Sequence, residues 1–273
     1  MKDSANRRKT TVRDLQRLAT AGEKIVALTA YDASMAKLAD GAGGVHLLLV
    51  GDSLGMTMLG YKTTIPVTLE DSLRYTAAVV RGTRYAMVIG DMPFLTYQVS
   101  VEETLHNAAR YLQEAGADGV KLEGGRAVAP TIARLVRAGI PVLAHVGVLP
   151  QAVLAEGGYR VHGRTEDEAA ALEADARAVQ DAGAFAVVLE CLTTPAAERI
   201  TRALRIPTIG IGAGPGCSGQ IQVMHDILGL FEDFVPKHTK RYAELATLSR
   251  EAIQAYCDDV RSGVFPGTAQ SFK

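Results

Sequence analysis

Three segments of the chain decide the fold: AGADGVKLE at residues 115–123, AGIPVLAH at residues 138–145 and AGAFAVVLE at residues 182–190. In each segment a glycine follows a helix-like stretch, and a short apolar run that ends near a charged side chain comes next. The alternation of helical periodicity with buried, strand-like runs is typical of parallel β/α proteins. Because the runs are almost continuously apolar, they predict strands that are covered on both faces.

Similar runs extend outward from these segments through most of the chain. Seven candidate strands and a shorter eighth one occur at Ile25–Thr29, Leu47–Val50, Tyr85–Ile89, Gly119–Leu122, Pro141–His145, Phe185–Leu189, Pro207–Ile211 and Phe234–Val235. Five or six such units would form an open doubly wound sheet, whereas eight close into a barrel. The count therefore predicts an α/β protein with a single (β/α)8 TIM barrel.

The ends of the chain predict two further helices. Thr11 to Ala21 suits an extra N-terminal helix, with Thr11 as N-cap and Asp14 at the third position, placed to close the bottom of the barrel. Thr239 to Ser262 also has a helical pattern. Because no linker or abrupt change in composition divides the chain, we expect one domain over residues 1–273, with residues 1–10 as a flexible tail.

Composition excludes several classes of protein. The chain has 273 residues, of which 48% are hydrophobic and 22% charged, so it has material for a large core. Its net charge of -1, with no tryptophan, argues against a nucleic-acid partner. No apolar run approaches the length of a membrane span. Three cysteines without metal or redox spacing favour a reduced, cytoplasmic protein.

Charged side chains stand at or just beyond the ends of the apolar runs. Sites of parallel barrels and open α/β sheets form at the carboxyl ends of strands, so these side chains are the candidate functional residues. A single acid after a strand is equally typical of a helix N-cap or a loop charge, and this alternative stays open for any one of them alone. The candidates are Asp52, Asp91, Lys121, Glu123, His145 and Glu190.

Lys121 and Glu123 predict a working site most directly. They lie two residues apart and so share one face of their strand, whereas Leu122 faces the helices. Burial of an ion pair for structure alone must overcome a desolvation penalty of several kcal/mol per ion. Several carboxylates without cysteine or clustered histidine suit a hard cation such as Mg²⁺ better than zinc.

His145 and Glu190 are candidates for proton transfer and substrate binding. His145 is either a core histidine with satisfied hydrogen bonds or a ligand of the substrate or of a metal-bound water. Glu190 is flanked by Leu189 and Cys191, and partial desolvation there suits a general base. The alternative for Glu190 is a solvated loop acid.

The sequence resembles the ketopantoate hydroxymethyltransferase family from about Thr29 to Pro266. No single motif is specific, but together they are. The motifs are TAYDASMAKL (29–38), VGDSLGM (50–56), PVTLEDS (66–72), VKLEGG (120–125), GGYRVHGR (157–164), LEC (189–191), IPTIGIGAG (206–214), GQIQVMHDILG (219–229) and PKH (236–238).

The resemblance implies a role for each candidate residue. The implied metal ligands of Mg²⁺ are Asp52, Asp91 and Glu123; the implied substrate-binding residues are Asp52, Ser53, Asp91, Lys121 and His145; and the implied catalytic proton acceptor is Glu190. The implied reaction transfers a hydroxymethyl group from 5,10-methylenetetrahydrofolate to 3-methyl-2-oxobutanoate through an Mg²⁺-stabilised enolate. Its product is 2-dehydropantoate (ketopantoate), in the first step of pantothenate synthesis. The family also implies a cytoplasmic homo-oligomer, expected to be a decamer, with no nucleic-acid or membrane partner.

Two alternatives and two departures stay open. A Mg²⁺-dependent barrel lyase or mutase of the phosphoenolpyruvate or isocitrate type also stabilises an enolate, and a non-catalytic oligomeric scaffold is possible on the same fold. The chain has AHVGVLPQ at residues 144–151 where the family often has GHxGLTPQ. Ser218 replaces an acid that is frequent in the family, which puts the folate or subunit contacts of its loop in doubt.

Overall fold

The computed structural model describes residues 7–272 and contains a closed barrel of eight parallel strands. Each strand pairs with the next one along the chain, and β1 pairs with β8 to close the barrel. This confirms the predicted (β/α)8 architecture. The strands are β1 (Ile25–Thr29), β2 (Leu47–Val50), β3 (Met87–Asp91), β4 (Gly119–Glu123), β5 (Val142–Gly147), β6 (Ala186–Glu190), β7 (Thr208–Ile211) and β8 (Gly219–Gln222).

The eighth strand is not where the sequence predicted it. Phe234 and Val235 are exposed and lie in no strand, so the prediction of a strand at Phe234–Val235 is wrong. The sequence GQIQ of β8 lacks the apolar character of the other strands, since only Gly219 and Ile221 are buried in it. In addition, residues 212–218 connect β7 to β8 without a helix, so the alternation of strand and helix is interrupted there.

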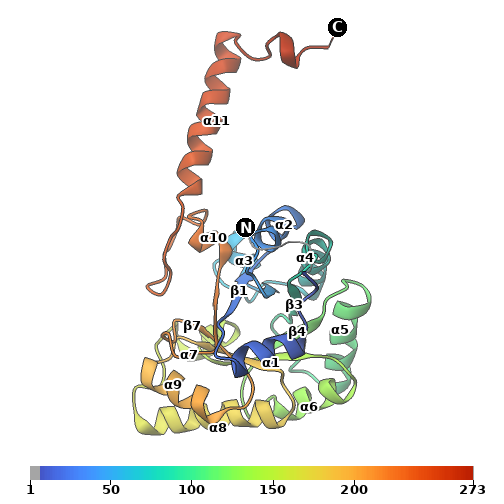
Figure 1. Cartoon of the computed structure of the whole chain (residues 1–273), viewed down its shortest axis with the longest axis vertical. Coiled ribbons are helices and arrows are strands. Elements are labelled where there is room, and N and C mark those ends of the chain that lie inside the picture. Colours follow the sequence, from blue (N-terminus) through green and yellow to red (C-terminus); the bar gives the residue numbers. More distant parts are fainter. Residues whose placement is uncertain (1–6, 273) are drawn as a thin grey trace. The chain divides into compact units, whose positions relative to one another are not determined.

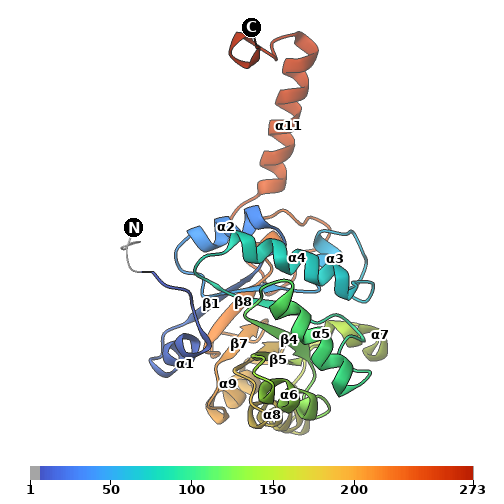
Figure 2. The same ribbon diagram turned by 90° about the vertical axis from the view of Figure 1, so that its right-hand side faces the viewer.

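Helices follow the other strands and lie on the outside of the barrel, as Figure 1 shows for α5, α6, α8 and α9 and Figure 2 shows from the side. Polar side chains start several of them: Ser100 accepts a hydrogen bond from the Glu103 N–H, and Thr165 accepts one from the Glu168 N–H. The helices are α2 (Ala33–Gly41), α3 (Leu54–Thr57), α4 (Leu69–Gly82), α5 (Val101–Gln113), α6 (Ala129–Arg137), η2 (Pro150–Ala152), α7 (Val153–Glu156), α8 (Glu166–Asp181) and α9 (Thr194–Ala203).

The extra N-terminal helix, α1 (Val12–Thr20), closes one end of the barrel. Thr11 and Asp14 form the predicted capping box at its start. Leu15 and Leu18 of α1 are buried in one cluster with inward side chains of the strands, among them Ile25. These contacts lie at the amino ends of the strands, opposite the end where the candidate residues stand.

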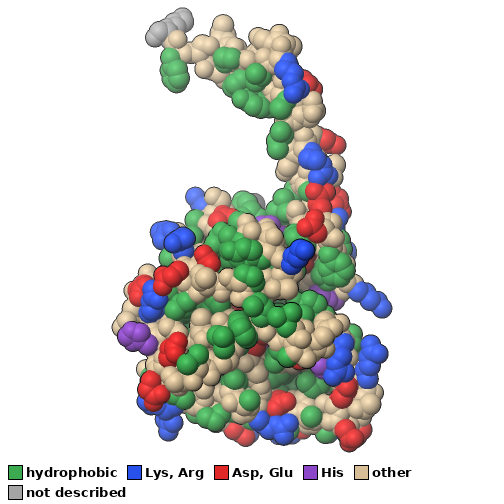
Figure 3. Space-filling model, turned by 180° about the vertical axis from the view of Figure 1, so that it is seen from behind, with side chains coloured by type: hydrophobic (Ala, Val, Ile, Leu, Met, Phe, Trp, Pro, Cys, Tyr) green, Lys and Arg blue, Asp and Glu red, His purple; other side chains and the backbone are tan. Residues whose placement is uncertain are grey.

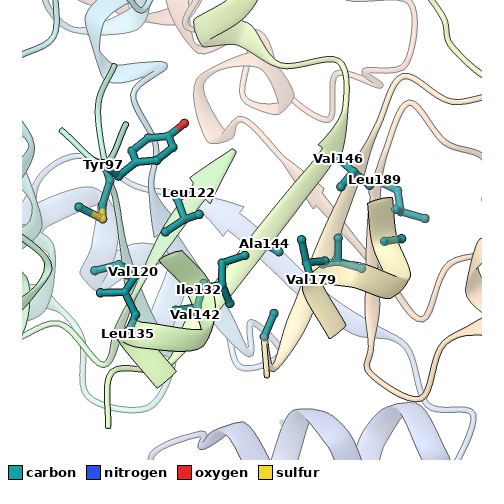
Figure 4. Packing of buried hydrophobic residues seen from close by; sticks show 14 of the residues in the cluster. Tyr97, Val120, Leu122, Ile132, Leu135, Val142, Ala144, Val146, Val179 and Leu189 are labelled. Carbon is teal, nitrogen blue, oxygen red and sulfur yellow. The ribbon is translucent and has the colours of Figure 1, made fainter. Parts of the chain in front are cut away.

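A second cluster of apolar side chains lies between the strands and the outer helices. Figure 4 shows Ile132 and Leu135 of α6 beside Val120 and Val142 of the barrel wall. Leu122 belongs to this outer cluster, which confirms that it faces the helices while its neighbours Lys121 and Glu123 face the interior. Alternate residues of β4 therefore face either the outer cluster or the interior of the barrel.

Backbone contacts divide the chain into two compact units, one ending at Gln222 and the other beginning at Val223. The second unit contains α10 (Met224–Ile227), α11 (Leu245–Ser262) and η3 (Thr268–Gln270). Helix α11 starts later than the predicted Thr239, because the Tyr242 N–H donates a hydrogen bond to the Ile227 carbonyl instead of joining the helix. One domain over residues 1–273 stays a prediction.

The predicted tail, residues 1–10, lies partly outside the described residues. Within the described part, the Arg7 guanidinium donates hydrogen bonds to the carbonyls of Asp40 and Val45. From Arg7 onward, no helix is both long and apolar enough to cross a membrane. Figure 3 shows charges of both signs interspersed over one face of the molecule, in keeping with the net charge of -1.

Candidate active site

The carboxyl ends of neighbouring strands bring the six predicted ionisable residues together. Asp52 follows β2 directly, Asp91 ends β3, and Lys121 and Glu123 lie on β4. Strand register places Lys121 beside Asp91, and His145 of β5 beside Glu123. The end residue of β6, Glu190, pairs with Gly147 one step further around the barrel. Five of the six side chains are buried, and only Glu190 reaches partial exposure.

The polar layer rests on apolar layers of the barrel interior. On β3 the inward residues Met87 and Ile89 belong to the core that α1 closes, and Asp91 is the next inward residue. On β5 the inward Leu143 precedes His145 in the same way. Side chains alternate along a strand, so the period of two that builds the core also points these polar groups into the opening at the carboxyl ends of the strands. This opening, with its six ionisable residues, is called the mouth below.

Lys121 connects two buried carboxylates. Its Nζ donates hydrogen bonds to Asp91 Oδ1 at 2.8 Å and to Glu123 Oε1 at 3.3 Å. Burial opposes the charged amine, but the attraction of Asp91, Glu123 and Asp52 raises the pKa of Lys121 well above its usual value. Burial also opposes ionisation of Glu123, yet Lys121 and His145 lower the pKa of Glu123 to about 2. Lys121 is therefore a permanent cation and Glu123 a permanent anion at neutral pH.

His145 lies between two acids. Its Nδ1 is 3.6 Å from Glu123 Oε1, and its Nε2 is 3.3 Å from Glu190 Oε2. Neither ring nitrogen makes a hydrogen bond of ordinary geometry, although both are at ion-pair distance. Burial and Lys121 oppose protonation, but the two carboxylates outweigh them and raise the pKa of His145 to about 9. The imidazolium thus links Glu123 to Glu190.

Asp52 and Asp91 form a close acidic pair. The backbone N–H of Asp52 donates a hydrogen bond to Asp91 Oδ2 at 3.0 Å. Burial and the neighbouring charges of Asp91 and Glu123 raise the pKa of Asp52 to about 8. Burial likewise raises the pKa of Asp91, against the opposing effect of Lys121. These two carboxylates are the groups of the mouth that most need a further cation.

The net charge of the six ionisable groups also indicates a missing cation. When all six groups are ionised, the carboxylates of Asp52, Asp91, Glu123 and Glu190 face only Lys121 and an imidazolium, which leaves two negative charges unbalanced. A divalent cation supplies the missing charge, and carboxylate oxygens are the ligands that Mg²⁺ prefers. The donor set therefore fits Mg²⁺ at Asp52 and Asp91.

The three predicted ligands do not act as one ready-made cluster. Within residues 7–272, no group of three or more histidine, cysteine or acidic side chains is arranged to hold a metal ion. The ammonium group of Lys121 lies between Asp91 and Glu123 and pairs with both. Glu123 as a direct ligand stays a prediction, and its carboxylate already pairs with both Lys121 and His145.

Ser53 starts the short helix α3 beside Asp52. Its hydroxyl lies 2.8 Å from the hydroxyl of Tyr31, so the two side chains share a hydrogen bond at the edge of the site. Cys191 directly follows Glu190 and has a φ of 51°, a backbone conformation that non-glycine residues rarely adopt. Strained residues of this kind gather at functional sites, and this one fixes the direction in which the chain leaves Glu190.

Sequence reasoning missed two residues of the site, Tyr97 and Gln151. The Gln151 side chain donates a hydrogen bond to Asp52 Oδ2 at 3.0 Å, and the Tyr97 hydroxyl donates one to Gln151 Oε1 at 2.8 Å. Gln151 is the last residue of the AHVGVLPQ segment (144–151), but the family motif implied no role for it. No pattern in the sequence indicated Tyr97. Both line a cavity of about 330 Å³ together with Glu123, Ile65 and several other mainly apolar side chains.

Ser218, which departs from the family pattern, lies away from the mouth. Its carbonyl accepts a hydrogen bond from the N–H of Ile25, at the amino end of β1. Its hydroxyl and N–H contact Thr208, at the start of β7. The replacement therefore concerns the opposite end of the barrel from the six ionisable residues.

Two solved enzyme structures share this fold. A phosphonopyruvate hydrolase in complex with oxalate and Mg²⁺ superposes with a TM-score of 0.60 at 15% identity, covering 96% of this chain and 93% of that one. A 2,3-dimethylmalate lyase, a member of the PEP mutase/isocitrate lyase superfamily, gives a TM-score of 0.59 at 20% identity, covering 97% and 92%. At these identities the likeness shows the fold alone.

Sequence comparison is more specific. The profile of the ketopantoate hydroxymethyltransferase family matches residues 9–268. A 3-methyl-2-oxobutanoate hydroxymethyltransferase of Chloroflexus aurantiacus is 60% identical over 261 residues, covering 96% of this chain and 92% of that protein. Its counterpart from Moorella thermoacetica is 51% identical over 269 residues, covering 98% and 100%. Relatives that share half or more of their residues over such lengths show that the chain belongs to the ketopantoate hydroxymethyltransferase family.

Proposed function

We propose that the chain is a 3-methyl-2-oxobutanoate hydroxymethyltransferase, which uses 5,10-methylenetetrahydrofolate to convert 3-methyl-2-oxobutanoate into 2-dehydropantoate, the first step of pantothenate synthesis. The observation that carries this proposal is the buried mouth with two unbalanced negative charges beside one accessible carboxylate, in a chain of this family. A divalent cation balances those two charges, and a 2-oxoacid supplies oxygen ligands of the kind that such a cation prefers.

Mg²⁺ at Asp52 and Asp91 would supply Lewis acidity for the two oxygens of a 2-oxoacid. Side chains of the mouth bind the substrate and stabilise its developing charge. Lys121 holds Asp91 in place and presents a fixed positive charge to the carboxylate or to the enolate that develops from the substrate. Ser53, at the start of α3, is positioned to hold the acid, and Tyr31 orients its hydroxyl.

Glu190 is proposed as the base that removes the C3 proton of 3-methyl-2-oxobutanoate. Its side chain is the only one of the four carboxylates with partial exposure, at 19%, so an entering substrate can reach it. Contact between Glu190 Oε2 and His145 Nε2 orients the carboxylate. The enolate carbon left by proton loss then forms a carbon–carbon bond to the methylene carbon of the folate. Both carbon–nitrogen bonds of that methylene carbon break, and one water supplies the hydroxyl group of ketopantoate. The proton from C3 and the second proton of the water end on the two folate nitrogens, which gives tetrahydrofolate.

The lyase or mutase alternative has support only from the fold, because the two solved structures described above share only 15% and 20% identity with this chain. The scaffold alternative predicts that the ionisable residues of the mouth have been lost, whereas all six are present and in contact with one another or adjacent. The transferase is therefore the better-supported proposal.

One assay tests the proposal. The purified protein is incubated with 3-methyl-2-oxobutanoate and 5,10-methylenetetrahydrofolate, with Mg²⁺ or with excess EDTA, and ketopantoate is measured by mass spectrometry. We expect product that depends on both the folate and the metal. Folate-independent cleavage of a longer 2-oxoacid would favour the lyase, and inactivity with every substrate would favour the scaffold.

Self-association to a homo-oligomer, expected to be a decamer, and a cytoplasmic location belong to the same proposal. Helix α11 has no buried residue and exposes Leu248, Ile253, Tyr256 and Val260, which supports a protein contact there. All three cysteines are unpaired, in keeping with a reducing compartment. Light scattering coupled to gel filtration measures the number of subunits.

A further inference from the structure

Tyr97 and Gln151 form a hydrogen-bonded bridge between the acids of the mouth. The Glu123 N–H donates to the Tyr97 hydroxyl at 3.2 Å, and this hydroxyl donates onward to Gln151 Oε1. Gln151 Nε2 then donates to Asp52 Oδ2 and to the Met92 carbonyl, both at 3.0 Å. The Gln151 backbone N–H donates a further hydrogen bond to Glu123 Oε2 at 3.2 Å. The bridge thus starts and ends at Glu123 and has a branch to Asp52.

Every hydrogen bond of the bridge has a fixed direction. Asp52 Oδ2 and the Met92 carbonyl accept hydrogen bonds, so the amide nitrogen of Gln151 faces them and its oxygen faces Tyr97. The Tyr97 hydroxyl accepts from a backbone N–H and has its one hydrogen left for Gln151. Both side chains are at most 5% exposed, so water does not substitute readily for a lost partner.

The bridge acts on the carboxylate that has the least support from elsewhere. Lys121 pairs with Asp91 and Glu123, whereas a neutral amide is the side-chain donor to Asp52. Figure 4 shows the ring of Tyr97 at the edge of the outer hydrophobic cluster, with its hydroxyl directed away from the aliphatic side chains. Tyr97 is therefore anchored by packing at one end and holds Gln151 with the other.

We infer that Gln151 is a positioning residue that orients the Asp52 carboxylate toward the cation of the site, and that Tyr97 acts through Gln151. This inference rests on the proposed function, because it assigns a role in metal binding to residues that act on the cation through the Asp52 carboxylate. Residues that hydrogen-bond to metal ligands commonly change metal affinity by about tenfold to a hundredfold.

The test measures binding of Mn²⁺ as a probe, by electron paramagnetic resonance, in the full-length protein without substrate. Gln151→Met keeps the length of the side chain and the backbone bond to Glu123 but removes the bond to Asp52. We expect the Kd for Mn²⁺ to rise about tenfold to a hundredfold. Tyr97→Phe removes one neutral hydrogen bond and should raise the Kd about twofold to tenfold.

A matched control separates positioning from general destabilisation. Gln180 is also a buried glutamine, and its Oε1 accepts a hydrogen bond from the Arg205 N–H near the amino ends of the strands. Gln180→Met should change the thermal midpoint but leave the Kd for Mn²⁺ unchanged. Because Tyr97 acts through Gln151, adding Tyr97→Phe to Gln151→Met should change the Kd by less than about twofold.

The outcomes distinguish this inference from the proposed function. Wild-type affinity in both Gln151→Met and Tyr97→Phe, in folded proteins, would overturn the inference and leave the transferase intact. Additive effects of the two substitutions would overturn the role of Tyr97 as acting through Gln151. Should Gln151→Met not fold, Tyr97→Phe alone decides. A wild-type protein that binds no Mn²⁺ and makes no ketopantoate would overturn the proposed function itself.

Discussion

Replacement of Lys121 by methionine tests the electrostatics of the mouth most directly. The change keeps an unbranched side chain of similar length and removes the only ammonium group that pairs with Asp91 and Glu123 in the described chain. The Lys121 side chain is 5% exposed and each of its partners 2%, so solvent does little to screen the two carboxylates that remain.

The distances from the Lys121 ammonium group to its two carboxylate partners determine the expected loss of stability. At an effective dielectric constant of about 20, contacts of 2.8 Å and 3.3 Å correspond to gross attractions of about 6 and 5 kcal/mol. Desolvation of the lysine opposes much of this, and the carboxylates of the variant can bind a proton instead. Loss of one partner of a buried ion pair typically costs about 3–5 kcal/mol, which is the fall in unfolding free energy we expect at pH 7.

An exposed pair of equal length is the control. Lys9 Nζ also lies 2.8 Å from a carboxylate, that of Asp118, but the two side chains are 40% and 28% exposed. Exposed pairs contribute about 0–1 kcal/mol, so Lys9→Met should have a small effect although the distance is the same. The comparison isolates burial as the cause.

Urea unfolding followed by circular dichroism measures all three proteins at pH 5 and pH 8. Without Lys121, burial raises the folded-state pKa of Asp91 and Glu123 above the unfolded-state values, so stability of the variant falls as pH rises. The deficit of Lys121→Met should therefore be larger at pH 8, and kcat/KM should also fall strongly. Equal losses in Lys121→Met and Lys9→Met would show that burial is not the cause. A deficit that shrinks toward pH 8 would show that loss of the ammonium group does not raise the pKa values of Asp91 and Glu123.

Three further predictions follow from the site and the first helix. Glu190→Gln should slow exchange of the C3 hydrogen of 3-methyl-2-oxobutanoate with solvent deuterium, measured by NMR, by about 10² or more; exchange at the wild-type rate would rule out Glu190 as the base. Asp52→Ala should lose most Mg²⁺ affinity in calorimetry. Because a proton on Asp52 competes with the ion and the pKa of Asp52 is about 8, wild-type affinity should rise with pH up to about 8, and a flat profile contradicts this. Asp14→Ala should cost about 1 kcal/mol of unfolding free energy at pH 7. The Thr11 hydroxyl and Arg8 lower the pKa of Asp14 from 3.8 to about 2. The loss of unfolding free energy in Asp14→Ala is therefore complete above pH 3.8 and disappears as pH falls through 2. Equal losses at pH 7 and pH 3 would contradict a capping role for Asp14.

The sequence predicted the barrel well wherever strand and helix alternate. The predicted β1 and β2 match the structure residue for residue, and the other apolar strands differ by a few residues at their ends. The sequence does not predict β8, because Gln220 and Gln222 interrupt the apolar pattern and no helix lies between β7 and β8. There the barrel closure itself, through pairing with β1 and β7, stabilises a segment that has little preference of its own.

The sequence predicted the charged residues of the candidate site and Ser53, but it did not predict the neutral side chains of Tyr97 and Gln151. Strand ends identify Asp91 or Glu190 because charges after apolar runs are conspicuous. Gln151 lies on a one-turn 3₁₀-helix after β5, and Tyr97 lies in the loop after β3, so only three-dimensional packing brings them to Asp52 and Glu123. Neutral hydrogen-bonding side chains in loops give no periodic pattern.

Helix α1 closes the barrel at the amino ends of the strands, and this closure limits how reactants and products reach the site. With that end closed by Leu15 and Leu18, both reactants must enter and both products must leave through the other opening. If the 2-oxoacid binds at Asp52 and Asp91 as proposed, it occupies a more buried position than a bulky folate that approaches the partly exposed Glu190. In that arrangement we expect ordered binding, in which the acid enters before the folate and the folate product leaves before ketopantoate.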